Sequence, residues 1–397
     1  MLPDWMLKSK VLVSVGSGGV GKTTVSAAMG LAAAVQGKKV LVMTIDPARR
    51  LANALGLQEL SEGECEIPKK DWCPEGVETD GQFFAMMLDQ KQAFDKLVER
   101  FSPTPESAQR IRDNRWYQQM STALAGAQDF MAMERLYEMS TQRDYDLIVL
   151  DTPPTSNAID FLNAPERIKG LLQMRSFQWI QDKLAEEGST TGRLLRWSGS
   201  ALLKLLGRVT GQEVMQEIWK LLEDLSVLSD SFQEHSEQAL ALLKSDESRF
   251  VQISVARRTP LTEALFLQEK LLDAGMNVSG FVLNRVPGFL YHKNEWVSLP
   301  KHVVEDDVEG LGQIASRVSP TPEQAPEVLE LMKELGEHVR HFRKRAELAQ
   351  EAVVFLKEHV EGQPWIHQLP LISDDISNLQ GLQRIAELLL DSSLTAS

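Results

Sequence analysis

The stretch VLVSVGSGGVGKTT, residues 11–24, decides the fold class of this chain. Its first five residues form a short β-branched run, which is typical of a strand buried on both faces of a parallel sheet. A glycine-rich turn follows this run. Residues 22–36 are rich in helix formers, and Gly37 stands where a helix of that length would end. The stretch therefore predicts a strand, a loop and a helix in succession.

The loop between this strand and helix has two glycines separated by four residues, followed by a lysine and a hydroxyl residue. Residues without side chains let backbone N–H groups converge on phosphates, and the following helix N-terminus adds partial positive charge. The pattern predicts a P-loop that binds Mg·ATP, in which Lys22 reaches the β- and γ-phosphates and Thr23 ligates Mg²⁺. The residues expected to bind nucleotide here are Gly16, Ser17, Gly18, Gly19, Val20, Gly21, Lys22, Thr23 and Thr24.

Strand and helix patterns alternate along much of the remaining chain. A helix is expected at 90–101, and another opens with Thr259 as N-cap and Pro260 behind it and closes at Gly275. The alternation predicts a doubly wound α/β fold with a mostly parallel sheet, helices on both faces and ligands at the carboxyl ends of the strands. The further expected strands are 39–45, 83–88, 146–150, 249–255, 278–284 and 367–371.

Helical periodicity replaces the strand patterns between residues 165 and 245, which indicates an α-helical insertion. A second helical stretch, 322–359, contains the basic run HVRHFRKR, which we interpret as a solvated helix face. The expected organisation is a first part of the ATPase core at 1–164, the insertion at 165–245, adenine-side core strands at 246–290, a helical segment at 291–365, and the last core strand and helix at 366–397.

The composition excludes several classes of protein. The 56 acidic and 42 basic residues give a net charge of −14, which disfavours general nucleic-acid binding because phosphate backbones would be repelled. The chain has no apolar run of membrane-spanning length, and its first residues lack the pattern of a secretory signal. The two cysteines, Cys65 and Cys73, are too few for a disulfide scaffold. These features predict a cytoplasmic protein.

Two predicted strand ends carry a carboxylate. Asp151 follows DLIVL and stands where a P-loop site needs a ligand for the water shell of Mg²⁺. Asp46 ends the strand pattern KVLVMTI. In a parallel sheet it would lie close enough to orient the water that attacks the γ-phosphate, although strand-end aspartates are as often helix N-caps.

Four segments in order, GSGGVGKTT, TIDPARRLANALG, LDTPPTSNAIDFL and GFVLNRV, resemble the arsenite-pump and guided-entry (tail-anchored protein targeting) ATPase family, of the deviant Walker A class. The resemblance implies that Asp46 lies in switch I and positions the attacking water, that Asp151 opens switch II, and that both carboxylates reach Mg²⁺ through water. It also implies that Asn284 reads the adenine edge and that Pro370 lies in the segment packing on the base. The segment GAQDFMAMERL is similar to a family helix start, which implies that Glu134 lies near a dimer interface.

The chain departs from the family pattern in two places. The deviant class usually carries a lysine directly after the first glycine of the loop, where it reaches the partner's nucleotide, but this chain has Ser17. Arg49 or Arg50 could supply the missing cation, or both could simply begin a solvated helix. The cysteines of a metalloid site are also absent, because Cys65 and Cys73 do not match that motif.

The resemblance to the targeting branch implies a homodimer whose helical part binds a hydrophobic client helix or a membrane-associated partner. Apolar residues of the insertion would form the client surface, together with methionines upstream, or both sets would form ordinary core. The alternatives are the energising ATPase of an arsenite or antimonite efflux system and a positioning ATPase like the chromosome-partitioning proteins. The residues considered for the client surface are Leu202, Leu203, Leu205, Leu206, Val209, Met215, Ile218, Trp219, Leu222, Met120, Met131, Met133 and Met139.

Overall fold

The computed structural model describes residues 1–45, 50–55, 57, 63–88, 90–120, 127–153, 220–221, 224, 229–287, 291–292, 295–296, 313–317, 321, 324–372 and 378–395. Eight of its strands form one sheet in the order β10-β7-β6-β1-β5-β2-β4-β3. The strands are β1 Val11–Val15, β2 Lys39–Thr44, β3 Cys65–Ile67, β4 Gln82–Met87, β5 Leu147–Asp151, β6 Ser248–Val255, β7 Val278–Val286, β8 Tyr291–His292, β9 Glu295–Trp296 and β10 Trp365–Pro370.

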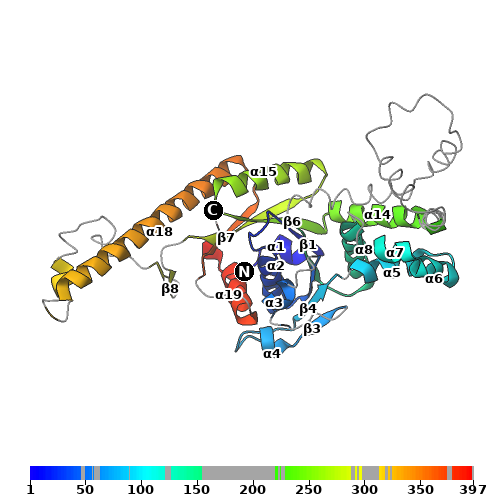
Figure 1. Ribbon diagram of the computed structural model, residues 1–397, viewed down its shortest axis with the longest axis horizontal. Coiled ribbons are helices and arrows are strands. Elements are labelled where there is room, and N and C mark those ends of the chain that lie inside the picture. The colour runs from blue at the N-terminus through cyan, green and yellow to red at the C-terminus, as the bar shows by residue number, and fades with distance from the viewer. Residues whose placement is uncertain are drawn as a thin grey trace, which may run out of the picture.

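Along the chain, most helices connect one strand of the sheet to the next, as a doubly wound fold requires (Figure 1). The helices are α1 Asp4–Lys8, α2 Lys22–Val35, α3 Arg50–Ala54, α4 Lys69–Trp72, α5 Gln90–Phe101, α6 Pro105–Asp113, α7 Arg115–Met120, α8 Ala127–Gln142, α14 Ser229–Lys244, α15 Arg258–Asp273, α18 Ala325–His359, α19 Leu379–Leu390 and the 3₁₀ helix η3 Ser392–Leu394.

The sheet is parallel except at one edge, where β3 runs antiparallel to β4. This confirms the predicted α/β class, and each predicted strand is present with its ends moved by at most two residues. The sequence reading missed β3 and the separate two-stranded hairpin of β8 and β9. Segments of two or three residues are too short to show the period-two alternation that reveals a strand.

Two apolar layers cover the sheet. On one face, α1, α2, α3, α4 and α19 pack on residues such as Val40, Val149 and Val251. On the other face, α5, α8, α14, α15 and part of α18 pack on the alternate residues, such as Leu41 and Leu150. Because strand residues alternate between faces, the parity of a position decides which layer it joins. Both faces of the sheet are therefore covered by helices.

Helix α2 ends as the sequence predicts. Gly37 has a φ of 92°, and its N–H donates to the carbonyl of Ala34 at 3.0 Å while that of Lys38 donates to Ala33 at 3.2 Å. This pair of bonds is a Schellman motif, which requires a residue that tolerates a left-handed conformation.

The predicted start of α15 is wrong by two residues. The helix begins at Arg258, with Arg257 at the N-cap, so that Thr259 is already inside it. The N–H of Arg257 donates to Val255 at 2.7 Å and its carbonyl accepts from Leu261 at 3.1 Å, so the backbone turns earlier than the threonine. Pro260 is tolerated at the third helical position because N–H groups of the first turn have no partner within the helix.

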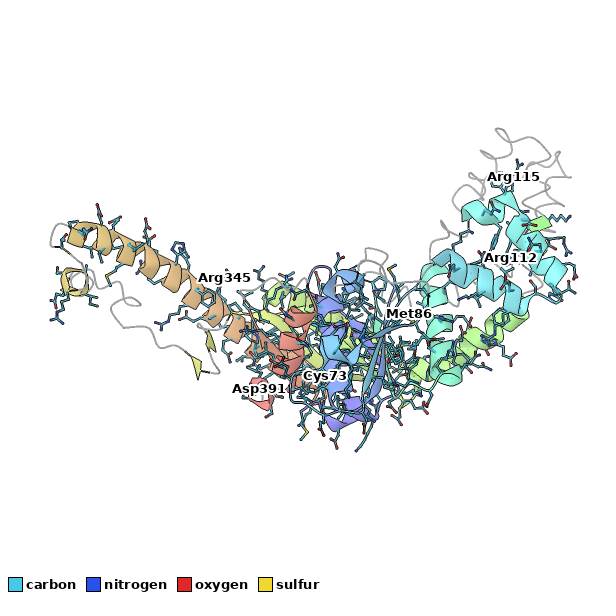
Figure 2. The ribbon with its side chains drawn as sticks, turned by 90° about the horizontal axis from the view of Figure 1, so that it is seen from below. Cys73, Met86, Arg112, Arg115, Arg345 and Asp391 are labelled. Carbon is cyan, nitrogen blue, oxygen red and sulfur yellow. The ribbon has the colours of Figure 1, made fainter. Side chains whose placement is uncertain are left out.

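Helix α18 has 35 residues and extends well beyond the sheet at one end of the molecule, while α5, α6, α7 and α14 form a lobe at the other end (Figures 1 and 2). Its last third is anchored through buried residues that include Val353 and Leu356. The basic run on α18 is exposed at His341, Lys344 and Arg345, as expected of a solvated face. No helix among the described residues is both long and apolar enough to cross a bilayer.

Candidate active site

The glycine-rich loop leaves β1 at the centre of the sheet and enters α2 at Lys22. A side chain at Gly16 would overlap the backbone carbonyl of Ile253 on the neighbouring strand β6. Gly21, the N-cap of α2, has a φ of 91° in the left-handed region, and a side chain there would overlap the amide of Asn284. Both ends of the loop therefore require glycine, and the loop lies against β6 and β7.

Lys22 and Thr23, the first two residues of α2, are buried, with 8% and 9% of their surface exposed. The ammonium of Lys22 folds back over the loop and donates to the carbonyl of Ser17 at 2.9 Å. Helix α2 has no acidic residue in its first turn, so its N-terminus keeps its partial positive charge. The arrangement is a cradle for an anion, with a lysine held across it.

Asp151 ends β5 beside this cradle and is 1% exposed. Because Leu147 and Val149 pack on the α2 side of the sheet, the period of two directs Asp151 to that side as well. Its Oδ2 accepts a hydrogen bond from Thr44 Oγ1 at 3.0 Å, and the two residues are register partners in β5 and β2. Strand pairing thus brings together an aspartate and a hydroxyl at adjacent strand ends.

Thr44 is a site residue that sequence reasoning missed. The only signal for it was its place at the end of a predicted strand, two residues before Asp46. On the other side of β5, Thr152 Oγ1 donates to the carbonyl of Ser14 at 2.7 Å, which ties β1 to β5 directly below the loop. These bonds hold the Asp151 carboxylate in place relative to the loop.

The end of β7 holds the far side of the loop. Asn284 Nδ2 donates to the carbonyl of Val20 at 2.8 Å, and the guanidinium of Arg285 donates to the carbonyl of Gly19 at 3.3 Å. The adenine role of Asn284 stays a prediction, since its amide here serves the loop backbone. Sequence reasoning did not single out Arg285. Its φ is 55°, and its backbone N–H donates a hydrogen bond to Asn284 Oδ1 at 2.9 Å.

Pro370 lies beside the same strand end. It pairs with Val286 at the last step of the β10–β7 ladder, and the N–H of Leu371 donates to Val286 at 2.9 Å. The structure therefore brings Pro370 close along the sheet to Asn284, although 86 positions separate them in the sequence. Its contact with a base stays a prediction.

Some predicted residues lie outside what the structure describes. They are Asp46, Arg49, the side chains of Arg50 and Met120, and the apolar residues of the insertion from Leu202 to Leu222. Three of the upstream methionines are described, and all three are buried in the core on α8: Met131, Met133 and Met139. Those three methionines are core residues and do not contribute to a client surface.

Glu134 on α8 is 4% exposed and lies 3.6 Å from Nδ1 of His235 on α14. Burial raises the pKa of Glu134 to about 7, with Arg100 opposing the rise. Burial also lowers the pKa of His235, and Arg100 acts in the same direction. Glu134 is therefore an interior group at the α8–α14 contact in the single chain.

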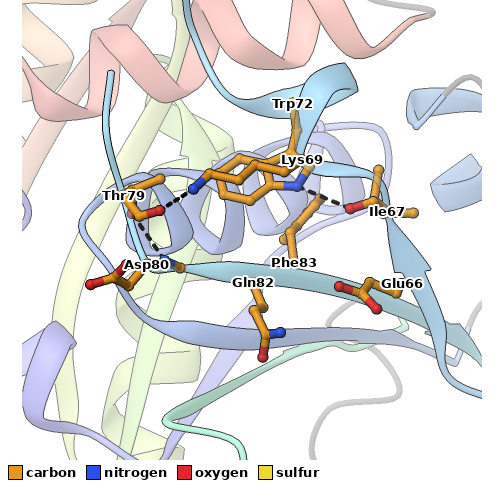
Figure 3. Close-up of a pocket in the computed structure, with 9 residues that line it drawn as sticks. Glu66, Ile67, Lys69, Trp72, Thr79, Asp80, Gln82 and Phe83 are labelled. Atoms are coloured by element: carbon orange, nitrogen blue, oxygen red, sulfur yellow. Dashed lines mark hydrogen bonds between the residues drawn. The ribbon is translucent and has the colours of Figure 1, made fainter. Parts of the chain in front are cut away.

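A polar pocket of about 280 Å³ lies beside β3, α4 and the amino end of β4 (Figure 3). Trp72 Nε1 donates to the carbonyl of Ile67 at 3.0 Å in its wall. It lies at the opposite end of the strands from the loop, so it does not belong to the nucleotide site. Its lining residues are Glu66, Ile67, Lys69, Trp72, Thr79, Asp80, Gly81, Gln82 and Phe83.

The donor set fits Mg²⁺ better than a structural metal. Among the described residues no group of three His, Cys, Asp or Glu side chains could hold an ion. Mg²⁺ usually takes one or two protein oxygens and fills its shell with water and phosphate oxygens. Thr23 and Asp151 can supply those two oxygens, since both lie buried beside the loop.

A glycine-rich loop between a central parallel strand and a helix, with an aspartate ending the adjacent strand, defines a P-loop nucleoside triphosphatase. Residues 9–294 match the sequence profile of the family described as Anion-transporting ATPase. That match covers most of the chain, so the chain belongs to this family. It is an ATP-hydrolysing P-loop enzyme.

Individual relatives are distant. The chain is 24% identical to "ATPase get3" of Aspergillus terreus over 272 residues, which cover 68% of this chain and 71% of that protein. It is 24% identical over 276 residues to "Putative arsenical pump-driving ATPase 2" of Aquifex aeolicus, covering 68% and 78%. It is 31% identical over 167 residues to an uncharacterized protein of Streptomyces coelicolor, covering 41% and 39%.

Proposed function

We propose that this chain is a cytoplasmic, Mg²⁺-dependent ATPase whose nucleotide state switches a homodimer that binds a hydrophobic client helix or a membrane-associated partner. The observation that supports the Mg²⁺ and ATP part of the proposal is that Lys22, Thr23 and Asp151 are all buried where the paired strands β1 and β5 end. A lysine, a hydroxyl and a carboxylate in that order around a glycine loop are the groups that phosphoryl transfer needs.

The loop would bind the phosphates through backbone N–H groups and the N-terminus of α2. Lys22 would leave the carbonyl of Ser17, which it bonds at 2.9 Å, and move onto the β- and γ-phosphates. The lysine is therefore held within the cradle before nucleotide arrives, so little side-chain ordering is needed on binding.

Thr23 and Asp151 would hold Mg²⁺, the carboxylate through water. When bound, the ion neutralises charge that develops on the β- and γ-phosphate oxygens. Thr44 keeps the Asp151 carboxylate oriented by its hydrogen bond at 3.0 Å. Asp46 would orient the attacking water, with Asn284 and Pro370 on the adenine side of the site.

The client role rests on the family resemblance and on the composition of residues 165–245, which we propose as a client or partner subdomain. Its last helix, α14, packs on α8 and β6 through buried Ala239 and Leu243, which would anchor the subdomain to the core. In this class, contacts to the γ-phosphate order switch loops and move attached helices. Arg49 or Arg50 is our candidate for the cation that crosses the dimer in place of a lysine at Ser17.

A second function is favoured by one observation, the similarity to a protein of Aquifex aeolicus named as an arsenical pump-driving ATPase. The cysteine content opposes it. Cys65 and Cys73 are the only thiols of the chain, and neither belongs to a three-residue metal-binding group among the described residues.

The Asp46→Asn variant tests the proposal, since it should bind ATP normally and hydrolyse it at least about a hundredfold more slowly. The variant loaded with ATP should retain a fluorescent peptide of about 20 apolar residues, and the ADP form should release it. Asp144→Asn, a change on the exposed turn before β5, is the control and should behave as wild type. Peptide binding that ignores the nucleotide would contradict the client role, and stimulation of hydrolysis by arsenite would favour the efflux function.

A further inference from the structure

The apex of the phosphate-binding loop is held by side chains from outside the loop. Ser17 Oγ donates a hydrogen bond of 2.6 Å to Oε2 of Glu263, which lies on α15. The chain positions of the two residues differ by 246, so this contact exists only in the folded protein. On the opposite side of the apex, Arg285 donates to the carbonyl of Gly19.

Glu263 is a poor ligand for phosphate, because a carboxylate repels the polyanion that the loop binds. Its side chain is exposed, so solvent screens that repulsion. The chemistry available to Glu263 is thus to fix the hydroxyl of Ser17, and with it the backbone at the start of the apex.

Helix α15 is a rigid support for this contact. Leu261, Ala264 and Leu267 bury one side of it against the sheet layer. Near its C-terminal end, the side chain of Gln268 exchanges two hydrogen bonds with the backbone of Glu361, at 3.1 and 3.2 Å.

The start of α15 is also anchored, since the guanidinium of Arg258 lies 3.4 Å from the ring centre of Phe355 on α18. Glu263 lies between these two anchored ends of the helix. The hydrogen bond between Glu263 and Ser17 therefore restricts the conformations of the glycine-rich loop, because α15 is anchored and cannot move with the loop.

We propose that Glu263 is a positioning residue for ATP binding, which acts through Ser17 by holding the phosphate-binding loop in its binding-competent shape. The inference rests on ATP binding at this loop. A loop shaped in advance loses less conformational freedom on binding, so the effect falls on affinity and leaves the chemical step unchanged.

The test measures ATP affinity by calorimetry, and KM and kcat by phosphate release, for five proteins: wild type, Glu263→Ala, Glu263→Gln, Ser17→Ala and the Ser17→Ala/Glu263→Ala double variant. Glu263→Ala should raise Kd and KM about five- to tenfold, the range of one net hydrogen bond, with kcat within about twofold. Glu263→Gln keeps an acceptor oxygen and should bind as tightly as wild type, or slightly tighter.

Ser17→Ala should weaken ATP binding as much as Glu263→Ala does. The double variant should lose no more ATP affinity than either single variant, because both changes remove the same hydrogen bond. Glu269→Ala, also exposed on α15, is the matched control and should leave every constant unchanged. Losses that multiply in the double variant, a failure of glutamine to restore affinity, or an unchanged Kd in Glu263→Ala would overturn the inference. Absence of ATP binding in wild type would instead overturn the proposed function.

Discussion

At the scale of single residues, Lys22 has the clearest expected effect. Its ammonium bonds a backbone carbonyl of its own loop and is not part of either apolar core. Removing it should therefore leave the fold intact while removing a charge that compensates the phosphates.

We expect Lys22→Ala to weaken ATP binding by at least about a hundredfold, since charge-assisted bonds to two phosphates are lost. Calorimetric titration measures the affinity, and an unchanged thermal midpoint shows that the fold survives. Lys38→Ala, near the end of α2 and remote from the loop, is a suitable control. An affinity within about threefold of wild type would contradict the P-loop assignment of Lys22.

Glu134 is a second residue with a defined consequence, in this case for stability. Its pKa rises from about 4.5 when unfolded to about 7 when folded, because burial disfavours the carboxylate. A group with a raised pKa contributes stability that is present below its unfolded pKa and is lost as the pH rises through its folded pKa. Stability from Glu134 should therefore fall between about pH 4.5 and 7, by an amount on the order of 3 kcal/mol.

His235 acts in the opposite direction, because its lowered pKa costs stability as the pH falls. Glu134→Gln keeps the shape and removes the titration, so the stability of the variant relative to wild type should increase from pH 5 to pH 8. Urea unfolding at several pH values measures that difference, in which the titrating groups remote from Glu134 cancel. Glu269→Gln, an exposed change on α15 away from α8, is the control. A relative stability that is independent of pH would show that Glu134 is not buried as a neutral acid.

At the scale of elements, the contact between α2 and the sheet sets the geometry of the loop. Gly30 is a point of close approach between α2 and the sheet, where an added Cβ would overlap Cγ2 of Val42 and lie 3.3 Å from the ring of Phe83. Both neighbours are fully buried, so neither can move aside easily. The helix whose first turn forms the phosphate site is thus held directly on β2 and β4.

Gly30→Ala should destabilise the protein even though alanine is the better helix former. The gain in helix propensity is about 1 kcal/mol, whereas overpacking a tight core costs about 1–3 kcal/mol. Thermal or urea unfolding measures the net loss. The double variant Gly30→Ala/Val42→Ala should lose less stability than the sum of the losses in the two single variants, since alanine at position 42 makes room for the added methyl group. Strict additivity would show that the predicted overlap is not the cause.

At the scale of the whole molecule, the proposed switch requires two chains. If the charge that normally crosses the dimer is absent at Ser17, ATP should close the dimer only moderately. A lysine introduced at position 17 would stand beside Glu263 of its own chain, because Ser17 already bonds that carboxylate. The new ammonium would then be partly held in place and kept from the partner.

Ser17→Lys should still strengthen ATP-dependent dimerisation, because it restores a charge that can reach the partner's nucleotide. Ser17→Lys with Glu263→Ala should strengthen it further, because the ammonium is then released from Glu263. Sedimentation with ADP and with a non-hydrolysable ATP analogue measures the dimer fraction. Arg50→Ala should weaken the wild-type dimer if that arginine is the replacing cation. A chain that stays monomeric with every nucleotide at concentrations well above micromolar would remove the homodimer and the composite client surface from the proposal.

Local sequence determined the α/β class, the loop and the strand ends that carry Asp151 and Asn284. Those features depend on short-range rules: apolar runs form buried strands, glycines permit positive φ, and a helix follows the loop. The Schellman end of α2 at Gly37 could be predicted for the same reason. The family resemblance added the adenine role of Asn284, which no local rule supplies, and agreed with the water-positioning role that the strand end already suggested for Asp46.

Only the tertiary structure decided which strands are neighbours and which side chains meet. Thr44 joins Asp151 because β2 pairs with β5, and Glu263 joins Ser17 because β6 lies beside β1 and places α15 next to the loop. It also decided that Met131 and Glu134 are interior, since α14 covers α8. Contacts between residues about 100 to 250 positions apart leave no local periodicity, because they arise from strand order and layer packing alone.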